Sequence, residues 1–150
     1  MIYYFAYGSN MSKEQMRNRG VSINTAVRCE LPGYRFLYNK ESIDGSSKAN
    51  IEKDKESVVH GVCFLLDQKS FEMLKGFEKG YTVLPVTAID MDENPIDAET
   101  FISESTCAKE PQNAYVKTII KGALEHNLPE SYIIETLSPK FTCQLDKKTI

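Results

Sequence analysis

The strand-like segments of this chain do not alternate regularly with its helix-like segments, and this order limits the folds that it can adopt. Turn residues at Pro32-Gly33 and at 92–95 each join two segments rich in aromatic and β-branched side chains, which is typical of antiparallel hairpins. We therefore expect an α+β domain with a curled or closed, antiparallel or mixed sheet of about six strands, and not a doubly wound dinucleotide fold. The expected strands are residues 2–6, 21–31, 34–39, 58–66, 81–91 and 96–102.

Three or four helices are expected around this sheet. Ser12 with Gln15 three residues later forms a capping-box pattern, and Asp67 stands at the N-cap position of a second helix. The polar segment 40–57 contains Gly-Ser-Ser near its middle and is expected to be a long mobile loop or a flexible insertion. The expected helices cover residues 12–19, 67–80, 112–127 and 129–137, and the third has the clearest helical spacing of apolar residues.

The length and composition are those of an ordinary globular chain. With 150 residues, 41% hydrophobic and 26% charged, we expect one domain over 1–140 and a polar C-terminal tail over 141–150. No apolar run reaches the length of a membrane span, so no membrane association is expected. The first eleven residues lack the basic start and long apolar centre of a secretion signal, and we expect a cytoplasmic protein.

Charge and cysteine spacing limit the partners. The formal net charge is −3 and the lysines alternate with acids along 48–56, so nucleic acid is not expected as a partner. The four cysteines are widely spaced and form no CxxC pair, which predicts reduced thiols and neither a metal site nor a disulfide framework. They are Cys29, Cys63, Cys107 and Cys143.

The first expected strand ends abruptly in the sequence YFAYGSNM, residues 4–11, directly before the first helix. Backbone N–H groups at such a junction are near the positive end of a helix dipole, and Gly8 lets a ligand approach the main chain. Ser9 and Asn10 add polar side chains. An anion-binding loop and a turn that satisfies only its own polar groups both fit these residues. A nucleotide site is disfavoured, because no Walker-type GK[ST] sequence is present.

The segment YFAYGSNM also resembles the signature loop of the γ-glutamylcyclotransferase-like family (AIG2-like or BtrG-like). Further segments similar to that family follow in the same order, and together they cover most of residues 2–137. They are AVRCELPGYRFLYN at 26–39, SKANI at 47–51, VVHGVCFLL at 58–66, MLKGFE at 73–78 and PQNAYVKTIIKGALEHNLPESY at 111–132.

The resemblance implies a fold and a site. The fold is a small mixed, mostly antiparallel β-barrel flanked by helices. Glu78 matches the catalytic glutamate of the family, and the signature loop matches the part that holds the glutamyl group of the substrate. Tyr115 matches a position close to the pocket, although an amphipathic core tyrosine fits equally well. The implied substrate-binding residues are Ala6, Tyr7, Gly8, Ser9, Asn10, Tyr81 and Tyr115.

The implied reaction needs no cofactor and no metal. In a small γ-glutamyl amino acid or amine, the free α-amine attacks the γ-carbonyl of the same molecule, closes 5-oxoproline and releases the other amine. Holding the substrate folded exploits an effective molarity on the order of 10⁵ M or more. A base must first remove a proton from the ammonium group, and a carboxylate does this well where burial raises its pKa from about 4.3 to roughly 6 or 7.

Several alternatives stay open at this point. Lys79 either pairs with Glu78 or binds a substrate carboxylate. The segment from Glu78 to Tyr81 is shorter than is common in the family, so a non-catalytic metabolite-binding or regulatory module with the same pocket is the competing reading. His60 and His126 are expected to be structural, because no serine or cysteine motif accompanies either. A monomer and a homodimer are both compatible with the sequence.

Overall fold

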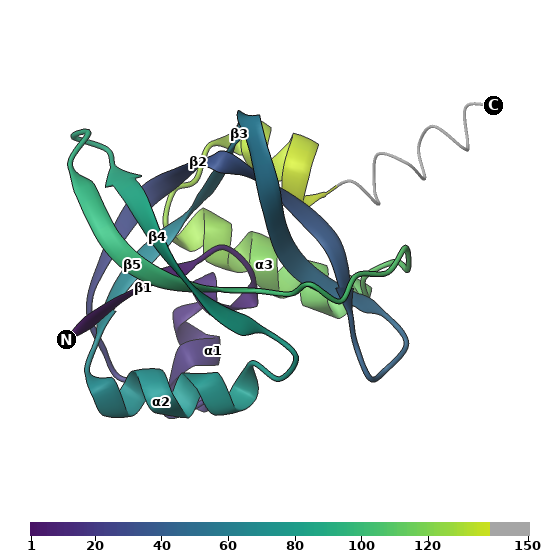
Figure 1. Ribbon diagram of the computed structural model, residues 1–150, viewed down its shortest axis with the longest axis horizontal. Coiled ribbons are helices and arrows are strands. Elements are labelled where there is room, and N and C mark those ends of the chain that lie inside the picture. The colour runs from purple at the N-terminus through teal and green to yellow at the C-terminus, as the bar shows by residue number, and fades with distance from the viewer. Residues whose placement is uncertain (139–150) are drawn as a thin grey trace.

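The computed structural model describes residues 1–138 of the chain. In Figure 1, β2 and β3 form a long bent ribbon, and α2 lies along the bottom of the molecule. The elements are, in order, β1 (Ile2–Ala6), η1 (Ser9–Met11), α1 (Lys13–Asn18), β2 (Ile23–Glu41), β3 (Ser47–Leu66), α2 (Gln68–Phe77), β4 (Thr82–Asp90), β5 (Pro95–Ile102), α3 (Asn113–Glu125), α4 (Glu130–Tyr132) and η2 (Ile133–Leu137).

Within residues 1–138 the strands close into one barrel in the order β1-β3-β2-β4-β5. Neighbouring strands run antiparallel except β1 and β5, which close the barrel in parallel through one pair, Tyr4 with Glu99. A second bond across the same seam runs from the Thr100 hydroxyl to the Phe5 carbonyl, at 2.7 Å. The expected mixed, mostly antiparallel barrel is therefore confirmed, with five strands in place of about six.

The difference in strand number comes from β2. The expected turn at Pro32-Gly33 is wrong, because β2 continues through both residues and stays paired with β3 on either side. The pairing register shifts between Pro32 and Tyr34, and Gly33 has a positive φ of 86°. A β-bulge of this kind bends a strand without ending it. Two expected strands are therefore one.

The loop expected over 40–57 is also wrong for most of its length. Only a short turn separates β2 from β3, and residues 47–57 are the first part of β3. Residues from Ser47 to Lys53 pair with β2, and Arg35 and Glu52 form an ion pair across the ribbon at 3.3 Å. The segment combines a buried part, with Ala49 and Ile51 in the core, and a polar, half-buried or exposed part over residues 52–57.

The helices agree with the sequence more closely. Ser12 caps α1 by accepting the Gln15 N–H at 3.2 Å, and Asp67 caps α2 by accepting the Ser70 N–H at 2.7 Å. The segment expected as the clearest helix is α3, and the short helix after Pro129 consists of α4 followed by the π-helical turn η2. Local capping and helical periodicity were sufficient to predict these elements.

The hydrophobic core fills the barrel and continues beneath the helices. Phe5 and Phe64 are fully buried on the paired strands β1 and β3, and Met11 and Met16 are fully buried at η1 and α1. Helix α3 packs against η1 at Gly122, where a Cβ atom would stand 2.7 Å from the Ser12 nitrogen and 2.8 Å from a Met11 backbone carbon. This contact fixes the turn after β1 against α3.

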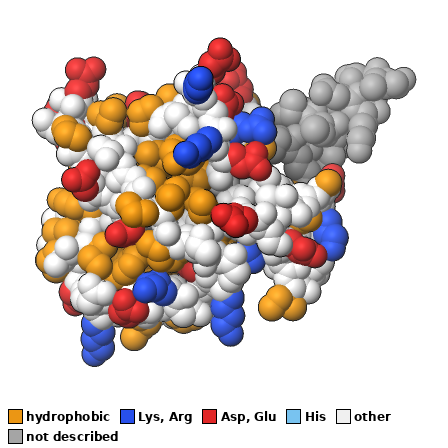
Figure 2. Space-filling model, in the orientation of Figure 1, with side chains coloured by type: hydrophobic (Ala, Val, Ile, Leu, Met, Phe, Trp, Pro, Cys, Tyr) orange, Lys and Arg blue, Asp and Glu red, His pale blue; other side chains and the backbone are white. Residues whose placement is uncertain are grey.

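The face of the molecule in Figure 2 carries acidic and basic side chains in scattered positions, with hydrophobic side chains gathered near its middle. No helix among residues 1–138 is long and apolar enough to cross a membrane. Cys29, Cys63 and Cys107 are free thiols, while Cys143 and the tail expected over 141–150 lie outside the described residues.

Candidate active site

The turn between β1 and α1 is a single turn of 3-10 helix. The Met11 N–H donates to the Gly8 carbonyl and the Ser12 N–H to the Ser9 carbonyl, both at 3.1 Å. The side chain of Gln15 does not return to the Ser12 backbone as in a complete capping box. It donates instead to the Ser9 hydroxyl at 2.5 Å, so this cap residue also fixes Ser9.

Gly8 lies close to Ala49 on β3. A Cβ atom at this position would stand 3.1 Å from the Cβ of Ala49 and 3.8 Å from the Tyr115 hydroxyl. The missing side chain therefore lets the turn, β3 and α3 converge at one point. Glycine is needed at this position because there is little space for a side chain.

Glu78 stands at the C-cap of α2 and points toward this turn. Its backbone N–H donates to the Lys75 carbonyl at 3.2 Å, and its side chain is only 14% exposed. The Asn10 amide donates to Glu78 Oε1 at 2.5 Å. The end of α2 and the turn after β1, 68 residues apart in sequence, thus meet through a direct hydrogen bond.

Arg19 completes a network around this carboxylate. Its Nη1 lies 3.0 Å from Glu78 Oε1 and 2.9 Å from the Asn10 side-chain oxygen. The guanidinium also stacks over the Phe77 ring, with 5.1 Å between its carbon and the ring centroid. The sequence suggests Lys79 as one possible partner for Glu78, but the ion pair comes from Arg19. No local pattern signals a residue 59 positions away.

The two carboxylate oxygens of Glu78 have different surroundings. Among the described residues, the hydrogen bonds that reach this group all end on Oε1. Oε2 receives no hydrogen bond from the described residues, and Glu78 lines the inner cavity. A carboxylate held through one oxygen presents the other in a fixed direction, which suits transfer of a proton to or from a bound molecule.

Two tyrosines hold the strand opposite Glu78. The Tyr115 hydroxyl accepts the Ala49 N–H at 2.9 Å, and the Tyr81 hydroxyl donates to the Ala49 carbonyl at 2.6 Å. Burial raises the pKa of both hydroxyls well above the ordinary value of 10.0, and the Glu78 charge raises it further. The phenols stay neutral near physiological pH and line the site as polar groups without charge.

Tyr4 and Tyr7 bring the first strand into the same site. The Asn10 amide donates to the Tyr4 hydroxyl at 3.0 Å, and the Tyr7 hydroxyl donates to the Phe101 carbonyl on β5 at 2.5 Å. Burial raises the pKa of both side chains, so they too are neutral. The site is thereby tied to the closing strand of the barrel.

These groups surround a small cavity of about 30 Å³, which we call the inner cavity. Its lining includes Glu78 and every expected substrate-binding residue except Ala6, which ends β1 and is fully buried outside the lining. Tyr4, Ala49 and Phe101 also line it and were not predicted from the sequence. The residues expected from the sequence that line it are Tyr7, Gly8, Ser9, Asn10, Glu78, Tyr81 and Tyr115.

A larger cavity of about 270 Å³, the outer cavity, shares Glu78, Tyr81 and Tyr115 with the inner one. It is bounded by the β2–β3 turn and by the residues that follow α2, which lie on the same side of the barrel in Figure 1. Lys79 lines this outer cavity, and so does Lys40. The two cavities are therefore adjacent, with Glu78, Tyr81 and Tyr115 between them, and we refer to the pair as the recess.

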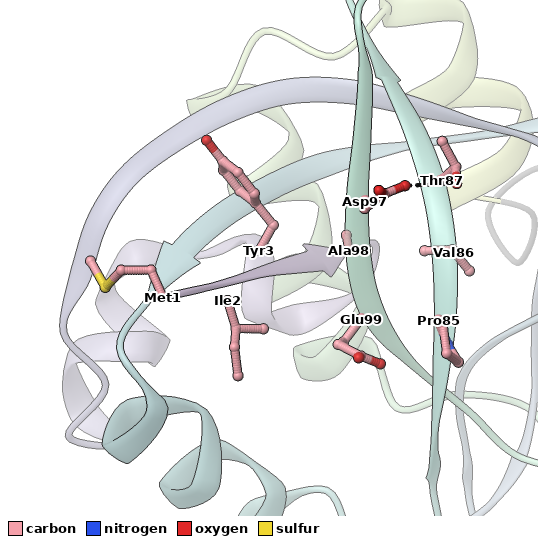
Figure 3. Close-up of a pocket in the computed structure, with 9 residues that line it drawn as sticks. All are labelled: Met1, Ile2, Tyr3, Pro85, Val86, Thr87, Asp97, Ala98 and Glu99. Atoms are coloured by element: carbon pink, nitrogen blue, oxygen red, sulfur yellow. Dashed lines mark hydrogen bonds between the residues drawn. The ribbon is translucent and has the colours of Figure 1, made fainter.

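A third hollow of about 470 Å³ lies at the seam between β1 and the β4–β5 hairpin (Figure 3). Asp97 points toward Thr87 there and accepts a hydrogen bond from its hydroxyl at 3.1 Å. Its lining contains none of the residues singled out from the sequence. The larger hollow therefore lies apart from Glu78 and from the turn after β1.

The histidines have structural positions. His126 contacts the Met11 carbonyl through Nε2 at 2.8 Å, and His60 packs against the ring of Tyr132. Burial lowers the pKa of both rings. Among residues 1–138, no three His, Cys, Asp or Glu side chains are grouped so that they could hold a metal ion.

Comparison with known proteins identifies relatives of this arrangement. Gamma-glutamyl cyclotransferase aclK of Aspergillus oryzae is 25% identical over 163 residues, which cover 90% of this chain and 60% of the fungal protein. A solved structure named gamma-glutamyl cyclotransferase aligns with a TM-score of 0.78 at 23% identity, over 89% of this chain and 85% of that one.

YkqA from Bacillus subtilis aligns with a TM-score of 0.74 at 26% identity, over 98% of this chain and 53% of that protein. The chain thus spans little more than half the length of this protein and 60% of the fungal relative. The model of the AIG2-like family matches residues 58–136, which is more than half of the sequence. From this match, the chain belongs to the AIG2-like family.

Proposed function

We propose that this chain is a γ-glutamyl cyclotransferase that converts a small γ-glutamyl compound to 5-oxoproline and a free amine. The observation that carries the proposal is the position of Glu78, whose carboxylate faces the same recess as the turn Gly8 to Asn10 and is hydrogen bonded by Asn10. The name of the Aspergillus relative supports the same activity.

Glu78 is the proposed proton carrier. Its Oε2 accepts a proton from the α-ammonium group of the substrate, and the freed α-nitrogen attacks the γ-carbonyl carbon. The new C–N bond closes the five-membered ring while the bond to the departing nitrogen breaks. Over the reaction the α-nitrogen gives up two protons and the leaving nitrogen receives two, with Glu78 transferring them between the two atoms.

The remaining groups position the substrate. The inner cavity has room for a group about as large as one water molecule, so only one end of the glutamyl group enters it. The turn Gly8 to Asn10 and the Tyr115 hydroxyl bind that end in this proposal. The rest of the substrate extends past Glu78 into the outer cavity. Such a folded pose brings amine and carbonyl together, and proximity supplies most of the rate.

The test is direct measurement of the cyclic product. The protein is incubated with a panel of γ-glutamyl amino acids and γ-glutamyl amines, and 5-oxoproline is quantified by mass spectrometry. Glu78→Gln keeps the size of the side chain and removes its proton-carrying capacity. We expect kcat to fall by roughly 10²- to 10⁴-fold, the usual contribution of a general acid-base group.

Glu72→Gln is the matched control, because Glu72 lies on the exposed side of the same helix and contacts only Lys75 and Gln68 among the described residues. Its activity should equal that of the native chain. A Glu78→Gln variant that stays folded and retains full activity would refute the role of Glu78. Ligand binding by the native chain without any 5-oxoproline would support the competing reading, a metabolite-binding or regulatory module.

A further inference from the structure

The charged side chains that line the outer cavity are mostly positive, and this points to the kind of amine that the substrate releases. We infer that this cavity binds the leaving amine and favours one with extra negative charge, as in a γ-glutamyl acidic amino acid. This inference rests on the proposed function, since it takes Glu78 as the point where the scissile bond lies.

The position of the outer cavity fits this role. Glu78, Tyr81 and Tyr115 line both cavities, so a molecule that places its glutamyl end among them continues outward into this space. The volume of about 270 Å³ is large enough for an amino acid and small for a folded peptide. The leaving group is therefore the part of the substrate that meets these walls.

Positive charges are concentrated in the lining of the outer cavity, although the chain is acidic overall. Among the described residues that line the outer cavity, Glu78 is the one carboxylate, and it is already paired with Arg19. Three ammonium groups remain, although the formal net charge of the whole chain is −3. They belong to Lys40, Lys48 and Lys79.

Two of these lysines are held at the mouth of the recess. The Lys48 nitrogen lies 4.3 Å from the centre of the Tyr115 ring, and the Lys40 nitrogen lies 5.1 Å from that of Tyr81. Both rings belong to tyrosines that contact Ala49 and line the junction of the two cavities. Cation–π contact thus holds the two ammonium groups beside the path of the substrate.

Internal partners neutralise these charges only weakly. Lys48 approaches the half-exposed Asp44 at 3.8 Å, and Lys40 donates to the uncharged carbonyl of Glu41 at 2.9 Å. Ion pairs of this length at a surface contribute little, so both ammonium groups stay available to an incoming carboxylate. A leaving amine that carries a positive side chain would meet repulsion from the same groups.

The experiment compares two substrates of nearly equal size that differ by one charge, γ-glutamyl-glutamate and γ-glutamyl-glutamine. We expect kcat/KM for γ-glutamyl-glutamate to be higher by roughly fivefold or more at low salt, mainly through KM, because several weak ion pairs add together. The ratio should approach one in 0.5 M NaCl, where the screening length is only about 3 to 5 Å. It should also approach one in the Lys40→Met/Lys48→Met double variant.

Lys55→Met is the matched control, because Lys55 is exposed on β3 and does not line either cavity. It should preserve the native ratio. Equal rates for the two substrates, or a ratio that the double variant leaves unchanged, would overturn the inference while cyclisation itself stood.

Failure of the proposed function gives a different result, namely no 5-oxoproline from any substrate. Calorimetric titration of the same two compounds then decides the role of the outer cavity. Tighter binding of γ-glutamyl-glutamate that is lost in the double variant would keep the assignment of an acidic ligand, and equal binding would overturn it.

Discussion

The contact between α3 and the turn after β1 predicts opposite effects for two glycine substitutions on helices. Gly122→Ala and Gly76→Ala both replace glycine in a helix, which alone favours folding by about 1 kcal/mol. At Gly76 the new Cβ atom has no heavy atom within 4 Å. We expect this variant to gain up to about 1 kcal/mol of unfolding free energy.

At Gly122 the same atom would stand 2.7 Å from the Ser12 nitrogen and 2.8 Å from Met11 backbone and side-chain carbons. These are mainly backbone atoms of a turn that is itself hydrogen bonded, and Met11 is fully buried. Overpacking of this kind costs roughly 1 to 3 kcal/mol and outweighs the gain in helix propensity. The net expectation is a loss of up to about 2 kcal/mol.

Urea unfolding followed by circular dichroism gives the unfolding free energy of both variants, and thermal unfolding gives their Tm. For a chain of this length, 1 kcal/mol corresponds to a change in Tm of about 2 to 4 °C, so the two variants should shift in opposite directions by readily measured amounts. If Gly122→Ala were as stable as Gly76→Ala, α3 would not press on the turn as described, and the role of this contact in fixing the turn after β1 would be refuted.

Two further predictions concern the site tyrosine and a buried histidine. Tyr115→Phe leaves the Ala49 N–H without its acceptor and should cost about 1 to 3 kcal/mol of unfolding free energy in a urea titration. Tyr3→Phe is the control, because the Tyr3 hydroxyl bonds to none of the described residues. Its unfolding free energy should stay within about 0.5 kcal/mol of that of the native chain. Burial lowers the pKa of His126 below 6.5, so the unfolded chain takes up this proton first and stability should fall as the pH drops from 7.5 to 5.5. The check is to compare the pH dependence of the unfolding free energy in the native chain and in His126→Gln. An equal slope in the two proteins would contradict the assignment. Burial also lowers the pKa of His60, which accounts for part of any slope that remains in the variant.

Local signals in the sequence were sufficient for several elements of the fold. Ser12 and Asp67 cap helices as their positions indicate, and the helical spacing across α3 is reproduced. The first strand and the turn that follows it were also predicted. In each case the deciding interactions lie within a few residues along the chain.

The long ribbon of β2 and β3 could not be predicted from such local signals. Residues 47–57 are polar, and a polar segment without periodicity looks like a loop when it is considered alone. Its strand structure comes from pairing with β2, including the contact of Arg35 with Glu52. Pro32-Gly33 likewise resembles a turn until the partner strand shows that it is a bulge.

Some residues of the candidate site could be predicted from the sequence, and others could not. The resemblance of YFAYGSNM and MLKGFE to family segments was sufficient to bring Asn10 and Glu78 forward as candidates. Arg19 could not be found, because it pairs with Glu78 across 59 positions. The convergence of Lys40, Lys48 and Lys79 depends on the β2–β3 ribbon, which the sequence reading had replaced with a loop.

The parallel seam between β1 and β5 has a consequence for how the protein acquires its pocket. Tyr7 reaches its partner Phe101 across 94 positions, and Thr100 reaches Phe5 across 95. During synthesis on the ribosome, the first strand must therefore wait for most of the chain to emerge before its second edge is covered. Contacts of such long range slow folding, and because Tyr7 and Phe101 both line the inner cavity, that cavity cannot be complete before the seam has closed.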